Sequence, residues 1–160
     1  MNEIFGFELD FSKSLRCIPM VVRCKLDTVG IKLKLDHWNS LSLEQRQALV
    51  DLDCDPHVVS TIAAYKEYVK NLVIASTGDA PKSIPVPNPL SWFDIMNIPP
   101  EVEAQVQHHE VMLTLKQWQK LSPLQRFALI KLSQPNHENK NFIPACEEFG
   151  LLPRFYADKN

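Results

Sequence analysis

The chain contains one segment twice. Residues 31–53 align without a gap with residues 111–133, and ten of the 23 positions are identical. Ordinary composition gives only about one or two such identities by chance. The alignment continues backwards at the same offset to Ile18-Pro19, which stands opposite Ile98-Pro99. A duplication of this length predicts two similarly folded repeats, and it constrains every other interpretation of the sequence.

Each copy carries the same signal for starting a helix. Ser42 and Gln45 have the spacing of a capping box, in which the hydroxyl and the side-chain amide each pair with a backbone N–H of the other residue. Ser122 and Gln125 repeat that spacing, and Pro123 occupies the first helical position, where no backbone N–H is needed. The tryptophan four residues before each serine is expected to pack in the core. The duplicated segment is therefore predicted to be mostly scaffold.

The remaining elements are predicted from hydrophobic spacing and from breaker residues. Apolar residues at helical spacing predict helices over 18–29, over 99–110 and from Asp55-Pro56 to about Ala75, with Gly30 closing the first in a left-handed conformation. Alternation of Phe5, Phe7, Leu9 and Phe11 with small or acidic residues predicts a short N-terminal strand or arm. Four prolines in the segment TGDAPKSIPVPNP predict an extended connector rather than an element. A short helix followed by an arm that packs Leu151, Leu152 and Phe155 is expected at the C-terminus.

These elements predict an all-α fold in which two repeats, 12–76 and 92–156, are joined by a proline-rich connector over 77–90. Either repeat would be only marginally stable alone, because a small domain buries a smaller share of its surface. We therefore expect a single compact domain over 1–160, in which the two helical repeats are related by an approximate two-fold axis and share one core.

Composition excludes several classes of protein. A net charge of −2 argues against a nucleic-acid-binding protein, which normally has a large basic excess. No apolar run approaches the ~20 residues that cross a bilayer, and the N-terminus has acids where a signal peptide needs bases. Four cysteines in such a chain are expected to be reduced thiols in the cytoplasm.

The two copies differ most in charge. Residues 13–34 carry six lysines and arginines and one aspartate, a sum of +5, whereas 93–114 carry four acids and no Lys or Arg, a sum of −4. Three interpretations are open. These segments are two solvated faces, or they attract one another within the chain, or the basic segment is a docking surface for an acidic protein or a phosphate-bearing ligand. Salt-sensitive association would favour the last.

The sequence gives little sign of catalysis or metal binding. Cys54 and His57 have a C-x-x-H spacing, but no second pair completes a zinc site, and the adjacent His108 and His109 point in different directions on a helix. No nucleophile elbow, phosphate loop or dinucleotide fingerprint is present. We therefore predict a protein that is not an enzyme and that holds no metal or cofactor of its own.

The N-terminal third, FGFELDFSKSLRCIPMVVRCKLDTVGIKLKLDHW, resembles the nitrate reductase-associated protein family, known chiefly from cyanobacteria. The similarity rests on an aromatic-rich arm followed by S-L-R-C-I-P-M, R-x-K-L-D, G-I-K-L and a tryptophan. It is strong as far as Cys54, whereas the connector and the C-terminal third match only in length and general character. The pattern lies over the basic segment and not over its acidic counterpart, which favours the docking interpretation.

The resemblance implies a non-enzymatic accessory or maturation factor for assimilatory nitrate reductase, a molybdopterin and iron–sulfur enzyme. Either the basic segment docks the apo-reductase and holds it open for molybdenum-cofactor insertion, in a chaperone-like role, or it receives the cofactor's phosphates directly. The family supplies no catalytic residues, so the site residues are chosen from the basic segment. They are Arg16, Arg23, Lys25 and Lys32 for charge, and Cys17 and Asp27 as flanking polar contacts.

Two alternatives from other classes stay open at this point. In the first, Cys17, Cys24 and Cys54 converge to bind a metal or a cofactor. In the second, the protein is an enzyme of cofactor metabolism that works through the basic segment.

Overall fold

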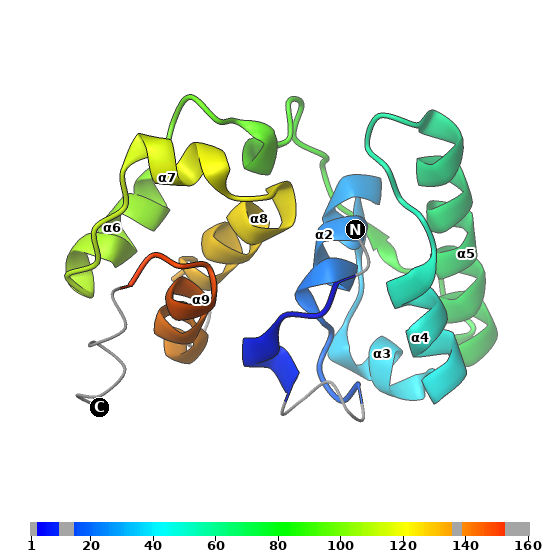
Figure 1. Cartoon of the computed structure of the whole chain (residues 1–160). Coiled ribbons are helices and arrows are strands. Elements are labelled where there is room, and N and C mark those ends of the chain that lie inside the picture. Colours follow the sequence, from blue (N-terminus) through cyan, green and yellow to red (C-terminus); the bar gives the residue numbers. More distant parts are fainter. Residues whose placement is uncertain (1–2, 10–14, 136–138, 153–160) are drawn as a thin grey trace. The chain divides into compact units, whose positions relative to one another are not determined.

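The computed structural model describes residues 3–9, 15–135 and 139–152, and this part of the chain is mainly helical (Figure 1). The chain divides into two compact units, Met1–Pro87 and Asn88–Asn160, here called unit 1 and unit 2. The boundary lies inside the predicted proline-rich connector. The arrangement of the two repeats about a two-fold axis, with one shared core, stays a prediction.

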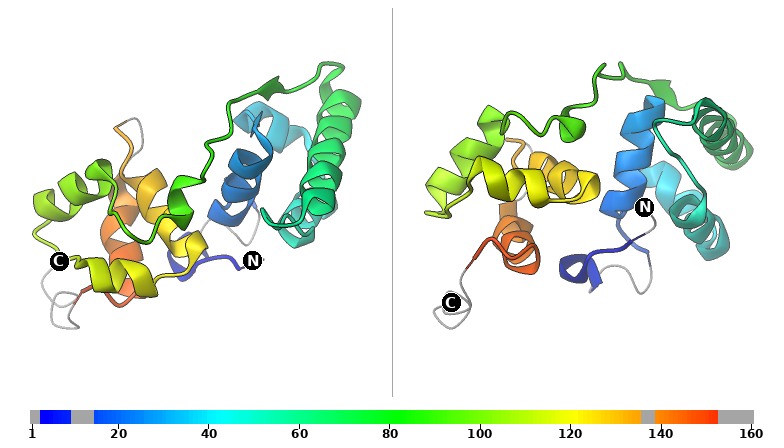
Figure 2. Two further views of the ribbon diagram at one scale, coloured as in Figure 1. Left: turned by 90° about the horizontal axis from the view of Figure 1, so that it is seen from above. Right: turned by 45° about the horizontal axis from the view of Figure 1, so that its top comes forward.

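Unit 1 is built around helix α2. The short 3-10 helix η1 (Gly6–Glu8) is followed by α2 (Met20–Val29), strand β1 (Ile31–Lys32), α3 (Leu35–Ser40), α4 (Leu43–Asp51), α5 (Val59–Thr77) and strand β2 (Lys82–Ser83). Helix α5 packs against α2 and α3, and α2 also contacts α4 (Figure 1 and Figure 2). The long helix α5 buries Tyr65, Val69 and Val73, which step by four residues along one face.

Unit 2 has α8 as its most buried helix. Its elements are η2 (Ser91–Phe93), α6 (Pro100–His108), α7 (Leu115–Lys120), α8 (Pro123–Leu132), η3 (Asn139–Asn141) and α9 (Phe142–Glu148). Helix α8 contacts η2, α6 and α9, and seven of its ten residues are buried. None of the helices in residues 3–9, 15–135 and 139–152 has the length and apolar character needed to cross a membrane.

The duplicated segments form corresponding elements. In the ungapped alignment of the two copies, α3 and α7 begin and end at equivalent positions, α2 begins opposite α6, and α4 begins opposite α8. Both capping boxes form: Ser42 Oγ accepts from the Gln45 N–H, and Ser122 Oγ accepts from the Gln125 N–H, each at 3.1 Å. Trp38 and Trp118 are fully buried, so their predicted packing role is confirmed.

The indole N–H of the tryptophan in each copy donates the same kind of hydrogen bond to a backbone carbonyl. Trp38 Nε1 donates to the Leu15 carbonyl at 2.6 Å, and Trp118 Nε1 donates to the Asp94 carbonyl at 2.9 Å. An arginine eight residues later donates to the carbonyl of each tryptophan, at 3.1 Å in unit 1 and at 3.4 Å in unit 2. The shared sequence thus produces the same local hydrogen-bonding pattern around the tryptophan in both copies.

Three predicted elements differ from the structure. Residues Gly6–Glu8 form a 3-10 helix and not a strand, while Asp10 and Phe11 lie outside the described residues. Helix α5 begins at Val59 rather than at Asp55-Pro56, because the Asp55 carboxylate accepts from the His57 N–H at 2.8 Å and closes a turn there.

The third difference concerns the connector, which was expected to lack any element. It contains β2, which pairs antiparallel with β1. The C-terminal helix is found as α9, followed by a buried Leu151 and a half-buried Leu152, whereas Phe155 lies outside the described residues.

Candidate functional site

The segment over residues 15–19, directly before α2, contains a turn with an unusual backbone. Leu15 has a positive φ of 48°, which costs a leucine about 1 kcal/mol relative to the ordinary regions. Its side chain is only 2% exposed, and its carbonyl accepts from Trp38 Nε1 at 2.6 Å and from Arg46 Nη1 at 3.3 Å. Burial and two long-range hydrogen bonds therefore hold this turn in place.

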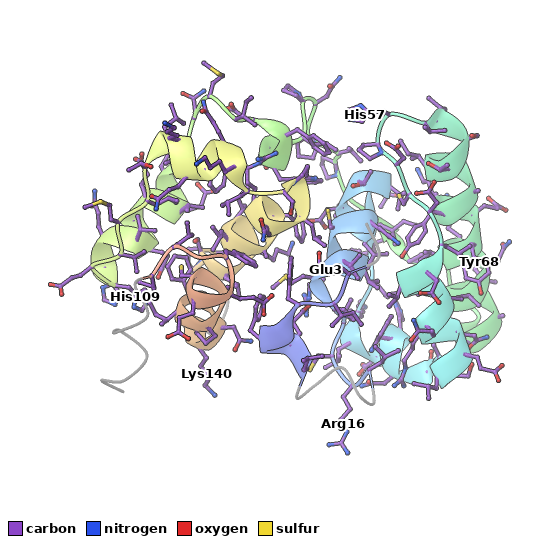
Figure 3. All side chains as sticks on the ribbon, in the orientation of Figure 1. Glu3, Arg16, His57, Tyr68, His109 and Lys140 are labelled. Carbon is purple, nitrogen blue, oxygen red and sulfur yellow. The ribbon has the colours of Figure 1, made fainter. Side chains whose placement is uncertain are left out.

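The turn leaves the next two residues exposed. The Arg16 side chain points away from the helices of unit 1 (Figure 3), and Cys17 is an exposed free thiol. Cys17 precedes α2 and is not helical, so it does not share a helix face with Cys24. Two of the predicted site residues thus lie together at the surface.

Arg23 connects this turn to the helix. Its Nε donates to the Ile18 carbonyl at 3.0 Å, and the side chain is half-buried. Burial lowers the pKa of Arg23, while the nearby Glu8, Cys17 and Asp27 act in the opposite direction. The structure therefore places Cys17 and the half-buried Asp27 near Arg23. A further neighbour of Arg23 is a carboxylate that the sequence had not indicated.

That carboxylate belongs to Glu8. Its Oε1 accepts from the Met20 N–H at 2.8 Å, in the first turn of α2, and its Oε2 accepts from the Phe5 N–H at 3.3 Å. A carboxylate at a helix N-terminus pairs with an otherwise unsatisfied N–H and with the positive end of the helix dipole. Sequence spacing missed it because the cap comes from twelve residues away, within a segment whose alternation predicted a strand.

The structure differs from the role predicted for Lys25. This lysine is only 3% exposed, and its Nζ donates to the carbonyls of Val50 and Leu52, each at 2.6 Å. Burial lowers the pKa of Lys25. The ammonium satisfies carbonyls at the C-terminal end of α4, so Lys25 supplies no charge to a docking surface.

Lys32 is exposed on β1, beyond the C-terminal end of α2, whereas Arg16 precedes its N-terminal end. A helix of ten residues is about 15 Å long. The cations of the basic segment consequently occupy separate places: Arg16 at one end of α2, Lys32 past the other, and Lys25 inside. Lys13 lies outside the described residues.

The cysteines do not assemble into a site. Cys24, Cys54 and Cys146 are buried free thiols, and burial raises the pKa of Cys54 to about 11 and that of Cys146 to about 12. Within residues 3–9, 15–135 and 139–152, no three His, Cys, Asp or Glu side chains lie close enough to hold a metal ion together. The arrangement in which Cys17, Cys24 and Cys54 converge therefore does not form.

The histidine pair at the end of α6 packs against α9. The ring centroids of His108 and His109 are 4.9 Å apart, and the His109 ring (Figure 3) stacks on that of Phe142 with a centroid distance of 5.4 Å. Burial, followed by the neighbouring His108, lowers the pKa of His109. His109 is thus a packing residue whose charged form is disfavoured by burial.

The acidic counterpart of the basic segment is open to solvent. Glu101 and Glu103, in the first turn of α6, and Glu110, just after that helix, are all exposed. Acids in the first turn also interact favourably with the helix dipole, so part of this charge has a structural explanation.

Comparison with known protein families gives a match over most of the chain. A family model described as conserved nitrate reductase-associated protein matches residues 4–149. That range encloses every described element, from η1 to α9. No curated protein and no solved structure gives a significant match to the chain.

Proposed function

Because the chain belongs to the nitrate reductase-associated protein family, we propose that it is a non-enzymatic accessory factor that binds assimilatory nitrate reductase directly. The family match over residues 4–149 is the observation that carries this proposal. The family description names a protein associated with the reductase rather than the reductase itself, which supports an accessory role.

The binding surface that we propose is formed by exposed cations of unit 1. Arg16 stands on a turn held by Trp38 and Arg46, and Lys32 stands on a strand. Exposed charges at the edge of an interface mainly raise the rate of association and make it sensitive to salt. Arg23 holds the segment after the turn through its bond to the Ile18 carbonyl, and Cys17 and Asp27 are flanking polar contacts.

The separation of these cations favours a protein partner over the cofactor. Arg16 and Lys32 lie beyond opposite ends of a helix about 15 Å long, which suits an extended acidic surface better than one compact phosphate group. We propose that the partner is the apo-reductase and that binding keeps it open while the molybdenum cofactor is inserted.

Two further parts of the proposal concern origin and location. The equivalent positions of the corresponding helices in the two copies support two repeats descended from one unit. The four free thiols support a cytoplasmic location, where cysteines stay reduced.

The test is capture of purified nitrate reductase, in its apo and holo forms, on the immobilised full chain at several salt concentrations. We expect the apo form to bind more tightly, and binding to weaken as salt rises. A double variant, Arg16→Gln with Lys32→Gln, is expected to bind about fivefold more weakly at low salt. Absence of capture of either form at low salt would refute the proposal, and equal capture of both forms would refute the role in cofactor insertion.

A further inference from the structure

The two short strands of unit 1 place a second lysine beside Lys32. In the antiparallel pair, Lys32 on β1 stands directly opposite Lys82 on β2, and Ile31 stands opposite Ser83. Residues directly opposite one another in an antiparallel pair point to the same face, with Cβ atoms about 5 Å apart. Ile31 is buried while both lysines are exposed, so the ammonium groups share the outer face of the ladder.

This position of Lys82 is fixed by the backbone. The Ile84 N–H donates to the Gly30 carbonyl at 2.9 Å, next to the ladder. Gly30 has φ of 74°, and a Cβ there would lie 2.8 Å from both the Ile84 carbonyl oxygen and a methyl carbon of Val86. The connector can follow this path only because residue 30 has no side chain.

The lysine pair is electrostatically unfavourable on its own. Like charges directly opposite in a ladder repel one another and destabilise the pairing. Within the described part of the chain, neither ammonium group has a hydrogen-bond or ion-pair partner. An anionic group seated over the ladder would relieve this repulsion.

We propose that Lys32 and Lys82 together form a cationic docking point for an acidic segment of a partner protein. This inference rests on the proposed function, which supplies the reductase as the partner, and it places the main contact at the β1–β2 ladder instead of at Arg16. Two carboxylates of one acidic segment can pair with the two ammonium groups at once. The second contact then forms at a high effective concentration.

The geometry of the pair can be tested without any partner. In Lys32→Glu the ladder carries opposite charges, and the melting temperature is expected to rise by roughly 2 °C. Lys32→Gln removes the repulsion without adding an attraction, and it is the control expected to raise the melting temperature by less than Lys32→Glu does. A lower melting temperature for Lys32→Glu than for wild type would overturn the proposed pairing.

Docking is tested with two probes at low salt: purified apo-nitrate reductase and a fluorescent hexaglutamate peptide. Lys32→Gln with Lys82→Gln is expected to weaken binding of both probes about tenfold. Lys116→Gln with Lys120→Gln changes net charge equally on exposed α7 positions and is expected to weaken binding less than twofold. Circular dichroism of each variant shows whether it is folded.

The outcomes separate this inference from the proposed function. If the ladder variant loses hexaglutamate binding while wild type fails to capture the reductase, the docking point stands and the reductase is the wrong partner. If the reductase binds the wild-type chain and the Lys32→Gln, Lys82→Gln variant equally well, the docking point is refuted while the accessory role stands. If wild type sediments as a dimer at low salt and the ladder variant as a monomer, the occupant is a second copy, and the inference of a different acidic partner is overturned.

Discussion

The Lys25 ammonium donates to the Val50 carbonyl at 2.6 Å, across 25 residues of sequence. With the second bond to Leu52 it completes the C-terminal end of α4, where backbone carbonyls have no partner inside the helix. The Tyr65 ring lies 5.8 Å from the same nitrogen, and the Tyr65 hydroxyl donates to the Leu49 carbonyl at 2.8 Å. Helices α2, α4 and α5 are thus joined at one point by polar contacts.

Replacing Lys25 should therefore affect stability. Lys25→Met keeps most of the length of the side chain but leaves two carbonyls without their donor, and we expect the free energy of unfolding to fall by about 2 kcal/mol. Urea denaturation measures this change, with Lys32→Met as an exposed control that should shift it by less than about 0.5 kcal/mol. Equal effects of the two substitutions would contradict the burial of Lys25.

Arg46 and Arg126 offer a comparison of one residue in two environments. Arg126 is 4% exposed and donates to the carbonyls of Trp92, Trp118 and Leu121, at 2.8, 3.4 and 2.5 Å. Arg46 is half-buried, so water can replace its lost bonds. We expect Arg126→Met to cost about 3 kcal/mol and Arg46→Met about 1 kcal/mol, measured by urea denaturation. The reverse order would show that burial does not decide the cost.

Gly30 and Gly78 separate backbone strain from steric contact. Both have positive φ, 74° and 81°, but a Cβ at Gly78 would meet nothing within 4 Å. Gly78→Ala is expected to cost about 1 kcal/mol, from the backbone conformation alone. Gly30→Ala adds contacts at 2.8 Å and should cost roughly 3 kcal/mol. Thermal denaturation of the two variants measures the difference, which would vanish if Ile84 and Val86 did not lie against Gly30.

The buried thiols predict a loss of stability at alkaline pH. The pKa of Cys146 is raised from an ordinary value of 9.0 to about 12, so between these values the unfolded chain has lost this proton while the folded chain keeps it. Raising the pH in that window therefore favours unfolding, and the stabilisation present below pH 9 is progressively lost. Cys54, with a pKa of about 11, acts in the same direction, whereas Lys25, with its lowered pKa, acts in the opposite one.

The contribution of Cys146 to the pH dependence of stability is measured by substituting it. Unfolding free energies between pH 8 and pH 10.5 should fall less steeply in Cys146→Ala than in wild type, even though the variant is less stable overall. Parallel curves for wild type and Cys146→Ala would mean that this thiol ionises equally in the folded and unfolded chain.

Much of the helical framework could be predicted because its signals are local. Capping boxes act over three residues, and Gly30 closes α2 by its own backbone conformation. The prediction of a strand in the N-terminal segment was wrong because it rested on local alternation alone. The Glu8 carboxylate accepts a hydrogen bond from the Met20 N–H, and no spacing within the segment indicates that contact.

The sequence by itself determined the duplicated helical segments, the serines that cap α4 and α8 and the burial of Trp38 and Trp118, since these depend on contacts within a few residues or on hydrophobicity. Only the tertiary structure decided which cations of the basic segment are available. It buried Lys25 against the end of α4, left Arg16 and Lys32 exposed, and set Lys82 opposite Lys32. Charge is a property of the residue, but its exposure depends on segments distant in the sequence that fold against it.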